Sequence, residues 1–259
     1  SNFLDGELPE MLDGLRNHIQ KFDGDLMTVY SERYKKILVK TKVVKNRIIK
    51  VVGMQRADKF FSSDFRPKQT YVLIFLIQTF RGLFKQNKKA IKFWEDLSEK
   101  AIKDILLVAK KYPKVNFIFK TRIPNEKFTK NQRIIIKKYP LNNCKIIYGG
   151  DSFNYIKDAK VIVGFNTSAL IEGLAAKKKI LVPYYQINNK FKKSFTMKIT
   201  KPIIGAKNSK QFIRNLERII KEKNYKLEIN NQAKKLLRYH IGNSDGKSYL
   251  RFSKYLNSI

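Results

Sequence analysis

The stretch VIVGFNTSALIEGLAAKKKILVPYY, residues 161–185, decides the fold class of this chain. It opens with an apolar run, VIVGF (161–165), which predicts a buried strand. Small and polar residues follow, then a helical pattern from about Ser168, and then a second apolar run, ILVPY (180–184). A buried strand, a polar turn, a helix and another buried strand are typical of one repeat unit of a parallel sheet.

The same alternation extends over residues 66–225. Further strands are predicted at YVLIFLI (71–77), VNFIFK (115–120) and CKIIYG (144–149), and further helices at 93–113, 125–140, 152–159 and 209–223. Apolar strands that alternate with helices predict a Rossmann-like α/β fold, a parallel sheet with helices on both faces.

The two ends of the chain have different patterns. Residues 1–65 predict a helix near PEMLDGLRNHIQKF (9–22) and strands at ILVKTKVV (37–44) and RIIKVVGM (47–54). This is too little for an independent α/β domain, so we expect the end of a domain whose beginning is absent. Residues 226–259 predict two basic helices joined at HIGNSDGKSY (240–249).

The chain carries a formal net charge of +34, with 55 Lys and Arg against 21 Asp and Glu. Only 12 of the 55 are Arg, the residue that reads base edges and phosphates bidentately. The many Lys, Ile, Asn, Phe and Tyr residues indicate a codon bias toward A and T. As the explanation of this excess positive charge we favour solvated basic faces, followed by binding to an anionic membrane surface or an anionic glycan. Specific nucleic acid binding is the least favoured explanation.

Other bulk features indicate a cytoplasmic protein. No apolar run approaches the ~20 residues that a membrane helix needs, and the acidic start SNFLDGELPE does not resemble a cleavable signal. The single cysteine, Cys144, excludes an intramolecular disulfide and suits a reducing compartment.

The polar turn after VIVGF is a candidate anion site. Asn166, Thr167 and Ser168 stand where a strand leads into a helix, and free backbone N–H groups there favour phosphate. The plainer alternative is that Asn166 or Thr167 only caps the helix. Glu172, four residues after Ser168, does not fit a capping box, which requires a spacing of three. It is either a ligand for ribose hydroxyls beside the phosphate turn or an exposed surface glutamate.

FNTSALIEGLAAKKKILVPYY resembles the donor-site segment of GT-B glycosyltransferases and their relatives in bacterial capsule and lipopolysaccharide synthesis. The sequence departs from that pattern at Lys179, where proline is usual, and in the order of Thr167 and Ser168. The resemblance implies phosphate contacts for Asn166, Thr167 and Ser168 and ribose binding for Glu172.

Three further segments resemble the same proteins. VVGMQRADKFF (51–61) is similar to a G-x-x-R-x-D junction that closes the N-terminal domain, and FIFKTR (117–122) to a strand that ends in basic donor-phosphate ligands, here Lys120 and Arg122. NSDGKSYLRFSKYL (243–256) is similar to a D-G-K-S tail. For that tail the resemblance implies nucleotide contacts, with site residues Asp245, Gly246, Lys247 and Ser248. A surface role for the basic pair and a plain turn before a capped helix stay open as alternatives.

The resemblance implies a metal-independent glycosyltransferase that needs no cofactor. It implies transfer of a sugar from a nucleotide-sugar donor to a surface polysaccharide or lipid-linked acceptor, in the cytoplasm or at the inner face of the membrane. The implied parts are a remnant of the acceptor-side domain (1–65), a nucleotide-sugar-binding domain (66–225) and C-terminal helices that pack back across the cleft (226–259). No catalytic residue is identified. His18 and His240 are the only histidines, and His240 is the nearer to the D-G-K turn. Without the missing part, the fragment is expected to be inactive.

Two classes of alternative remain. The first is an enzyme of the same architecture, either a UDP-sugar 2-epimerase or a glycerophosphate transferase. The segment FNTSALIE lacks the D-S-G-G-x-x-E-E pattern of such epimerases, which disfavours that assignment. The second is a non-enzymatic basic binding module, which predicts nucleic acid binding with steep salt dependence. The aromatic–glycine motifs of RNA-binding sheets are absent.

Overall fold

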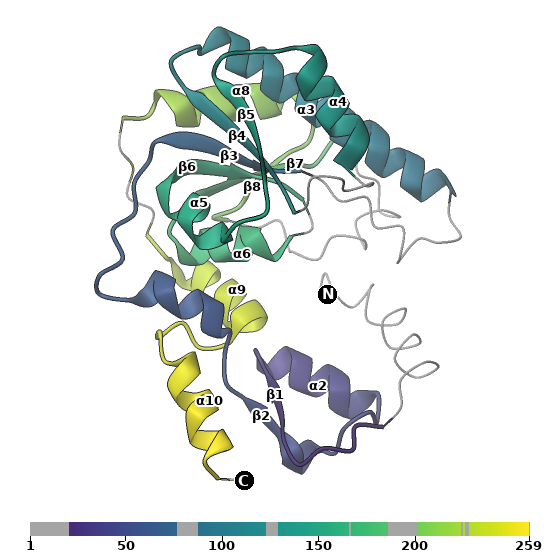
Figure 1. Ribbon diagram of the computed structural model, residues 1–259, viewed down its shortest axis with the longest axis vertical. Coiled ribbons are helices and arrows are strands. Elements are labelled where there is room, and N and C mark those ends of the chain that lie inside the picture. Colours follow the sequence, from purple (N-terminus) through teal and green to yellow (C-terminus); the bar gives the residue numbers. More distant parts are fainter. Residues whose placement is uncertain are drawn as a thin grey trace.

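The computed structural model describes residues 21–76, 88–122, 129–165, 167–185, 201–223, 225 and 228–258. Figure 1 shows a large α/β unit joined to a smaller one by the segment before β3 and by the C-terminal helices. The elements are, in chain order, β1 (Met27–Val29), α2 (Glu32–Lys40), η1 (Asn46–Ile48), β2 (Ile49–Val51), η2 (Gln55–Phe61), β3 (Tyr71–Phe75), α3 (Lys88–Lys111), β4 (Asn116–Thr121), α4 (Lys130–Lys138), β5 (Cys144–Tyr148), α5 (Ser152–Asp158), β6 (Ala159–Val163), α6 (Ser168–Ala175), β7 (Lys179–Pro183), β8 (Ile204–Ala206), α8 (Ser209–Lys221), α9 (Asn231–Ile241) and α10 (Ser248–Leu256).

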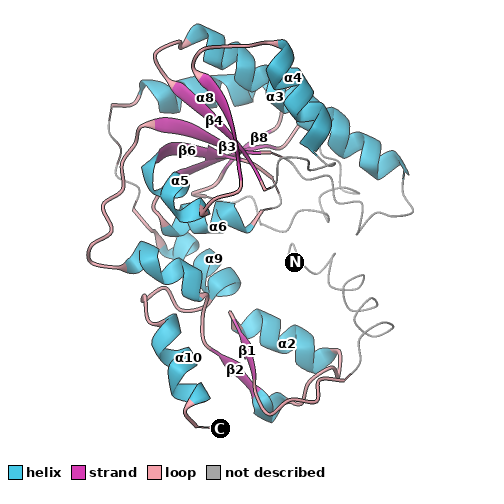
Figure 2. Ribbon diagram, in the orientation of Figure 1, coloured by secondary structure: helices cyan, strands magenta, loops and turns pink. Residues whose placement is uncertain are grey.

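In the described part of the chain, the large unit is built on a six-stranded sheet of order β5-β4-β3-β6-β7-β8, and every pairing in it is parallel. Helices α3, α4 and α8 lie on one face and α5 and α6 on the other (Figures 1 and 2). The predicted Rossmann-like α/β fold is therefore confirmed. The strand order reverses direction between β3 and β6, and a sheet of this kind binds ligands at the carboxyl ends of the strands beside that point.

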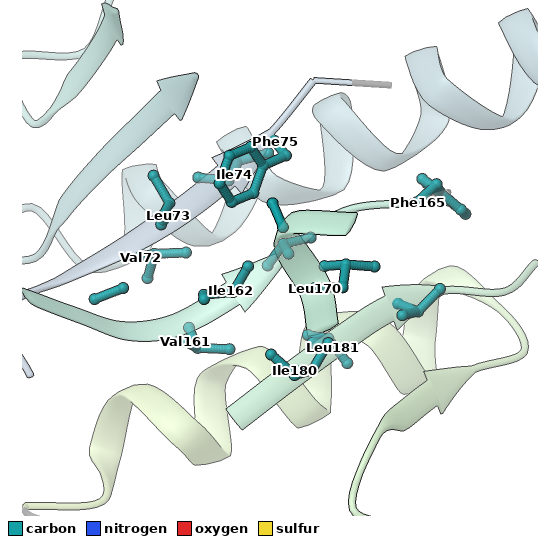
Figure 3. Packing of buried hydrophobic residues seen from close by; sticks show 14 of the residues in the cluster. Val72, Leu73, Ile74, Phe75, Val161, Ile162, Phe165, Leu170, Ile180 and Leu181 are labelled. Atoms are coloured by element: carbon teal, nitrogen blue, oxygen red, sulfur yellow. The ribbon is translucent and has the colours of Figure 1, made fainter. Parts of the chain in front are cut away.

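The core of the large unit forms where the central strands meet α6. Figure 3 shows Val72, Leu73 and Ile74 of β3 with Ile162 of β6, and Leu170 of α6 close by. All five side chains are at most 2% exposed. Burial of this kind stabilises the fold by roughly 1.5–3 kcal/mol for each large aliphatic side chain. These strands are apolar on both faces because helices cover both faces, which is why they appear in the sequence as continuous apolar runs.

Most predicted elements are confirmed, one prediction needs correction and two short strands were missed. ILVKTKVV (37–44) is not a strand, since its first four residues end α2. Its β-branched residues favoured a strand. However, Tyr34, Ile37 and Leu38 share one face of a helix. Tyr34 and Leu38 pack against the core of the small unit, and Ile37 is buried. The short strands β1 and β8 were not predicted, since each has only three residues. Of the helix predicted near 9–22, residues 9–20 lie outside the described residues.

The small unit contains a parallel pair, β1 and β2, connected through α2. A separate cluster fills it, with Val29, Val43, Val44 and Ile49 buried. The two predicted C-terminal helices are confirmed as α9 and α10. Helix α9 packs on both α6 and α2, so it contacts the large and the small unit at once. The domain boundaries at 65/66 and 225/226 stay a prediction.

Candidate functional site

A cleft of about 680 Å³ opens at the carboxyl ends of β3, β4, β5 and β6, beside the point where the strand order reverses. Its lining comes from the ends of these strands, from the first two turns of α6 and from η2: Arg56, Phe75, Leu76, Lys120, Thr121, Arg122, Gly149, Gly150, Asp151, Ser152, Phe165, Thr167, Ser168, Ala169 and Glu172. Five of the predicted site residues are therefore brought together here, namely Lys120, Arg122, Thr167, Ser168 and Glu172. Asn166 lies outside the described residues.

Thr167 caps α6 and so fixes the N-terminus of this helix at the cleft. Its Oγ1 accepts a hydrogen bond from the backbone N–H of Ala169 at 3.3 Å. The capping role considered from the sequence is thus present in the structure. It leaves the helix dipole and the remaining amides of the first turn directed at the cleft, a favourable place for an anion.

Glu172 is a buried carboxylate on the wall of the cleft, which excludes the alternative of an exposed surface glutamate. The residue is 6% exposed because α6 is covered by the sheet on one side and by α9 and η2 on others. Gly173 permits this close packing, since a Cβ there would lie 2.5 Å from Ile162 Cδ1. Burial raises the pKa of Glu172, and the charge of Arg56 opposes that shift.

Arg56 is the residue of this site that the sequence analysis did not assign to it. Its Nη2 lies 2.9 Å from Glu172 Oε1 and donates to Ser168 Oγ at 2.8 Å. The motif match G-x-x-R-x-D was recognised as a junction, but 112 residues separate Arg56 from Ser168. Only the fold could show that η2 lies against the start of α6.

Lys120 lies at the floor of the cleft, at the end of β4. The side chain is 5% exposed, and its Nζ donates to the carbonyls of Gly149 and Gly150 and lies 5.1 Å from the centre of the Tyr155 ring. Burial lowers the pKa of this amine, while Asp151 acts in the opposite direction. Lys120 thus ties the turn after β5 to the cleft, and a direct contact with a donor phosphate stays a prediction.

The turn Gly149–Ser152 was also missed as part of the cleft. It follows β5 at the carboxyl end, so the rule that placed Thr167 and Ser168 here could have found it. Asp151 caps α5 by accepting from Phe153 N–H at 3.0 Å.

The predicted tail residues Asp245, Gly246, Lys247 and Ser248 are not among the residues that line this cleft. They lie against η2 and the segment before it. Asp245 forms a two-bond pair with Arg251, at 2.8 and 2.9 Å, and a Cβ on Gly246 would lie 3.4 Å from Phe61 Cβ. The geometry here fits the alternative of a turn before a helix, packed on the junction motif.

The junction motif holds this tail through its other two matched residues. Asp58 Oδ2 accepts from Tyr249 N–H at 2.9 Å at the start of α10. Gly53 has φ of +95°, and a Cβ there would lie 2.3 Å from Ser248 Oγ, which is fully buried. Of the three matched residues, Arg56 therefore lines the cleft, whereas Gly53 and Asp58 contact the start of α10.

His240 is placed away from the residues that line the cleft. It is a buried residue of α9, its ring packs edge-on against Tyr239, and burial together with the charge of Arg33 lowers its pKa to about 4. This describes a neutral histidine of the core. Within the described ranges, no group of three or more His, Cys, Asp or Glu side chains could hold a metal ion. Within the same ranges, no helix is both long and apolar enough to cross a membrane.

No family model and no curated protein matches this sequence. The solved structures give clear matches in fold. One is the UDP-GlcNAc 2-epimerase of Methanocaldococcus jannaschii, solved with UDP-GlcNAc and UDP, with a TM-score of 0.50, 16% identity and coverage of 90% of this chain and 61% of that one. Another is a UDP-N-acetylglucosamine 2-epimerase, with a TM-score of 0.51, 12% identity and coverage of 90% and 57%.

At such identities the likeness shows the fold alone. The chain has the GT-B type of α/β architecture, as its resemblance to surface-carbohydrate enzymes implied. It spans about three fifths of the length of these matched chains.

Proposed function

We propose that this chain binds a nucleotide-sugar and forms the donor-side part of a GT-B glycosyltransferase that makes a surface polysaccharide or a lipid-linked glycan. The observation that carries the proposal is the cleft at the strand ends, where a buried carboxylate, Glu172, stands one helical turn from a capped helix N-terminus. A nucleoside diphosphate has the complementary chemistry, with ribose hydroxyls for the carboxylate and phosphates for the helix N-terminus.

In this proposal the residues have separate roles. The first-turn amides of α6 and the hydroxyls of Thr167 and Ser168 bind the phosphates, and Asn166, which lies outside the described residues, stays a predicted donor contact. Glu172 accepts hydrogen bonds from the ribose hydroxyls. Arg122 supplies positive charge at the mouth of the cleft, and Lys120 from its floor. Fixed positive groups near the leaving diphosphate would stabilise the charge that develops there without a metal ion.

The acceptor, the sugar and the catalytic base are not specified by these residues. A lipid-linked acceptor would bring the protein to the anionic inner face of a membrane, which its net charge of +34 would favour. The tail residues Asp245 to Ser248 are left out of the proposed donor site, because their contacts are with η2 and Arg251.

The test is a nucleotide panel on the wild type and on Glu172→Gln. Uridine, cytidine, guanosine and adenosine diphosphates are titrated by calorimetry, with thermal unfolding as a second readout. We expect one base to bind, and we expect Glu172→Gln to weaken that binding about tenfold or more, because the ribose loses a charged acceptor. Glu217→Gln is the matched control, since Glu217 of α8 pairs with Lys111 at the end of α3 and is not among the residues that line the cleft.

Equal binding by the wild type and Glu172→Gln would remove Glu172 from the site. Binding of no nucleotide by the wild type would remove the proposal. The epimerase alternative is separated by incubating the protein with UDP-GlcNAc and analysing the sugar nucleotides. Formation of the 2-epimer would replace glycosyl transfer as the assigned reaction.

A further inference from the structure

Arg56 occupies the place that the proposed function gives to the donor ribose. One nitrogen, Nη2, contacts both Glu172 Oε1 and Ser168 Oγ. These two acceptors lie one turn apart on α6, and the proposed function assigns one to ribose and the other to phosphate. In this structure, the arginine therefore satisfies both polar groups that a donor would use.

The two ends of this ion pair differ in burial, and that decides which of them can move. The side chain of Arg56 is 54% exposed, whereas that of Glu172 is 8% exposed. The exposed arginine can leave at small cost to itself, because water solvates the freed guanidinium. The carboxylate stays where the helix holds it. It also accepts a hydrogen bond from the side chain of Ser168, but loss of Arg56 would leave its buried negative charge without an ion-pair partner, which is costly. A ligand that displaces Arg56 must therefore bring donors for Glu172.

Resting on the proposed function, we propose that Arg56 is an exchangeable arginine. It pairs with Glu172 as in this structure, and it transfers to the donor's diphosphate when ribose hydroxyls take its place at Glu172. The planar guanidinium binds phosphate oxygens bidentately, and η2 holds it at the same cleft as Thr167 and Ser168. The exchange needs both parts of the ligand. Hydroxyls replace the arginine at Glu172, and phosphates receive it.

This inference predicts selectivity for an intact nucleoside diphosphate. A nucleoside alone must compete with Arg56 for Glu172 and gains nothing from the released arginine. Inorganic pyrophosphate alone can attract Arg56 only by leaving Glu172 unpaired. The fragments should therefore bind much more weakly than the diphosphate, and removal of the arginine should affect the nucleoside and the diphosphate in opposite directions.

The experiment takes the base that the wild type binds in the nucleotide panel. It measures the affinities of that nucleoside and of its diphosphate by calorimetry at pH 8 for the wild type, Arg56→Gln and Arg56→Lys. We expect Arg56→Gln to lower the affinity for the diphosphate at least threefold and to raise the affinity for the nucleoside at least threefold. Arg56→Lys should retain part of the diphosphate affinity, because it keeps the charge and loses the fork. Arg66→Gln is the matched control, since Arg66 is not among the residues that line the cleft and donates hydrogen bonds to the nearby carbonyls of Ser63 and Phe65.

A fall in both affinities, or an unchanged nucleoside affinity, would overturn the exchange and leave Arg56 as a structural or plain phosphate-binding residue. That failure is distinct from failure of the proposed function, which is decided by the wild type and Glu172→Gln alone. A crystal structure with the bound diphosphate gives a second readout. The inference requires Arg56 on a phosphate oxygen, and persistence of the Arg56–Glu172 pair beside bound nucleotide would overturn it.

Discussion

Two charged residues of the cleft are buried, and each depends on a partner that lies far away in the sequence. Glu172 and Lys120 are at most 6% exposed, and each has a partner with which its charge is satisfied. Both partners became visible only in the fold, because neither is near in sequence. Glu172 became a candidate site residue because it does not fit a capping box. Lys120 became one because FIFKTR resembles a strand that ends in basic donor-phosphate ligands. What the sequence could not provide was the arginine that faces the carboxylate.

His240 gives a prediction for stability against pH. Burial lowers its folded pKa to about 4 from an ordinary value of 6.5. Between these two values the unfolded chain binds more protons than the folded one, so stability falls as the pH drops through this window. From pH 7 to pH 5, we expect the wild type to lose about 2 kcal/mol through this residue.

Urea unfolding at the two pH values measures this loss. His240→Gln should be less stable at pH 7, because the imidazole packs against Tyr239, but it should lose about 2 kcal/mol less than the wild type on acidification. Equal losses in the two proteins would mean that His240 is solvated and titrates normally.

At the scale of elements, the long apolar strands and the amphipathic helices of the large unit followed from periodicity. The errors occurred where an element is short or where local propensity conflicts with packing. ILVKTKVV looks like a strand, yet residues 37–40 end α2, where Thr41 Oγ1 bonds back to the carbonyls of Ile37 and Leu38. Strand β8 has three residues and is fixed by pairing with β7, which the sequence alone does not show.

The tail motif NSDGKS was a site prediction from resemblance, and its role in nucleotide binding stays a prediction. A short turn with glycine before a helix start serves a structural or a binding role equally well in a sequence. The packing favours the structural role, since Ser248 is fully buried beside Gly53 and Arg251 Nε donates to the carbonyl of Val52 at 2.9 Å.

Asp245→Asn tests that role. The substitution weakens the two-bond pair with Arg251, and the pKa of Asp245, held at about 2 by that arginine, shows how strongly the charged form is favoured. The pair is partly solvated, so we expect a loss of stability below about 1 kcal/mol. Nucleotide affinity should stay within twofold of the wild type by calorimetry. A tenfold loss of affinity at unchanged stability would return the turn to the donor site.

At the scale of the whole molecule, two sheets are held together by segments that are far apart in sequence. The backbone N–H of Met54 donates to the carbonyl of Ile241 at 3.0 Å, and Ser31 Oγ donates to the carbonyl of Tyr239 at 2.8 Å. The end of α9 therefore ties the small unit to the junction motif, while the rest of α9 covers α6. The helix that packs on α6, which carries Glu172, thus also contacts the small unit.

The net charge of +34 acts on every anionic ligand, and salt dependence separates its effect from that of the cleft. The screening length falls from about 10 Å at 0.1 M salt to a few Å at 1 M. Between these concentrations of NaCl, we expect the affinity for the diphosphate to fall about tenfold and that for its nucleoside to change less than twofold, since the nucleoside carries no charge.

Calorimetry with both ligands measures this difference, and a single-stranded RNA oligonucleotide serves as the comparison. If the chain were only a basic binding module, its affinity for RNA would fall steeply with salt concentration, and excess nucleoside diphosphate would not stabilise the folded protein. If the phosphates lie at the N-terminus of α6, the diphosphate stabilises the fold even where salt has abolished RNA binding. Its stabilising effect should then depend on Glu172, a buried residue that bulk salt screens little.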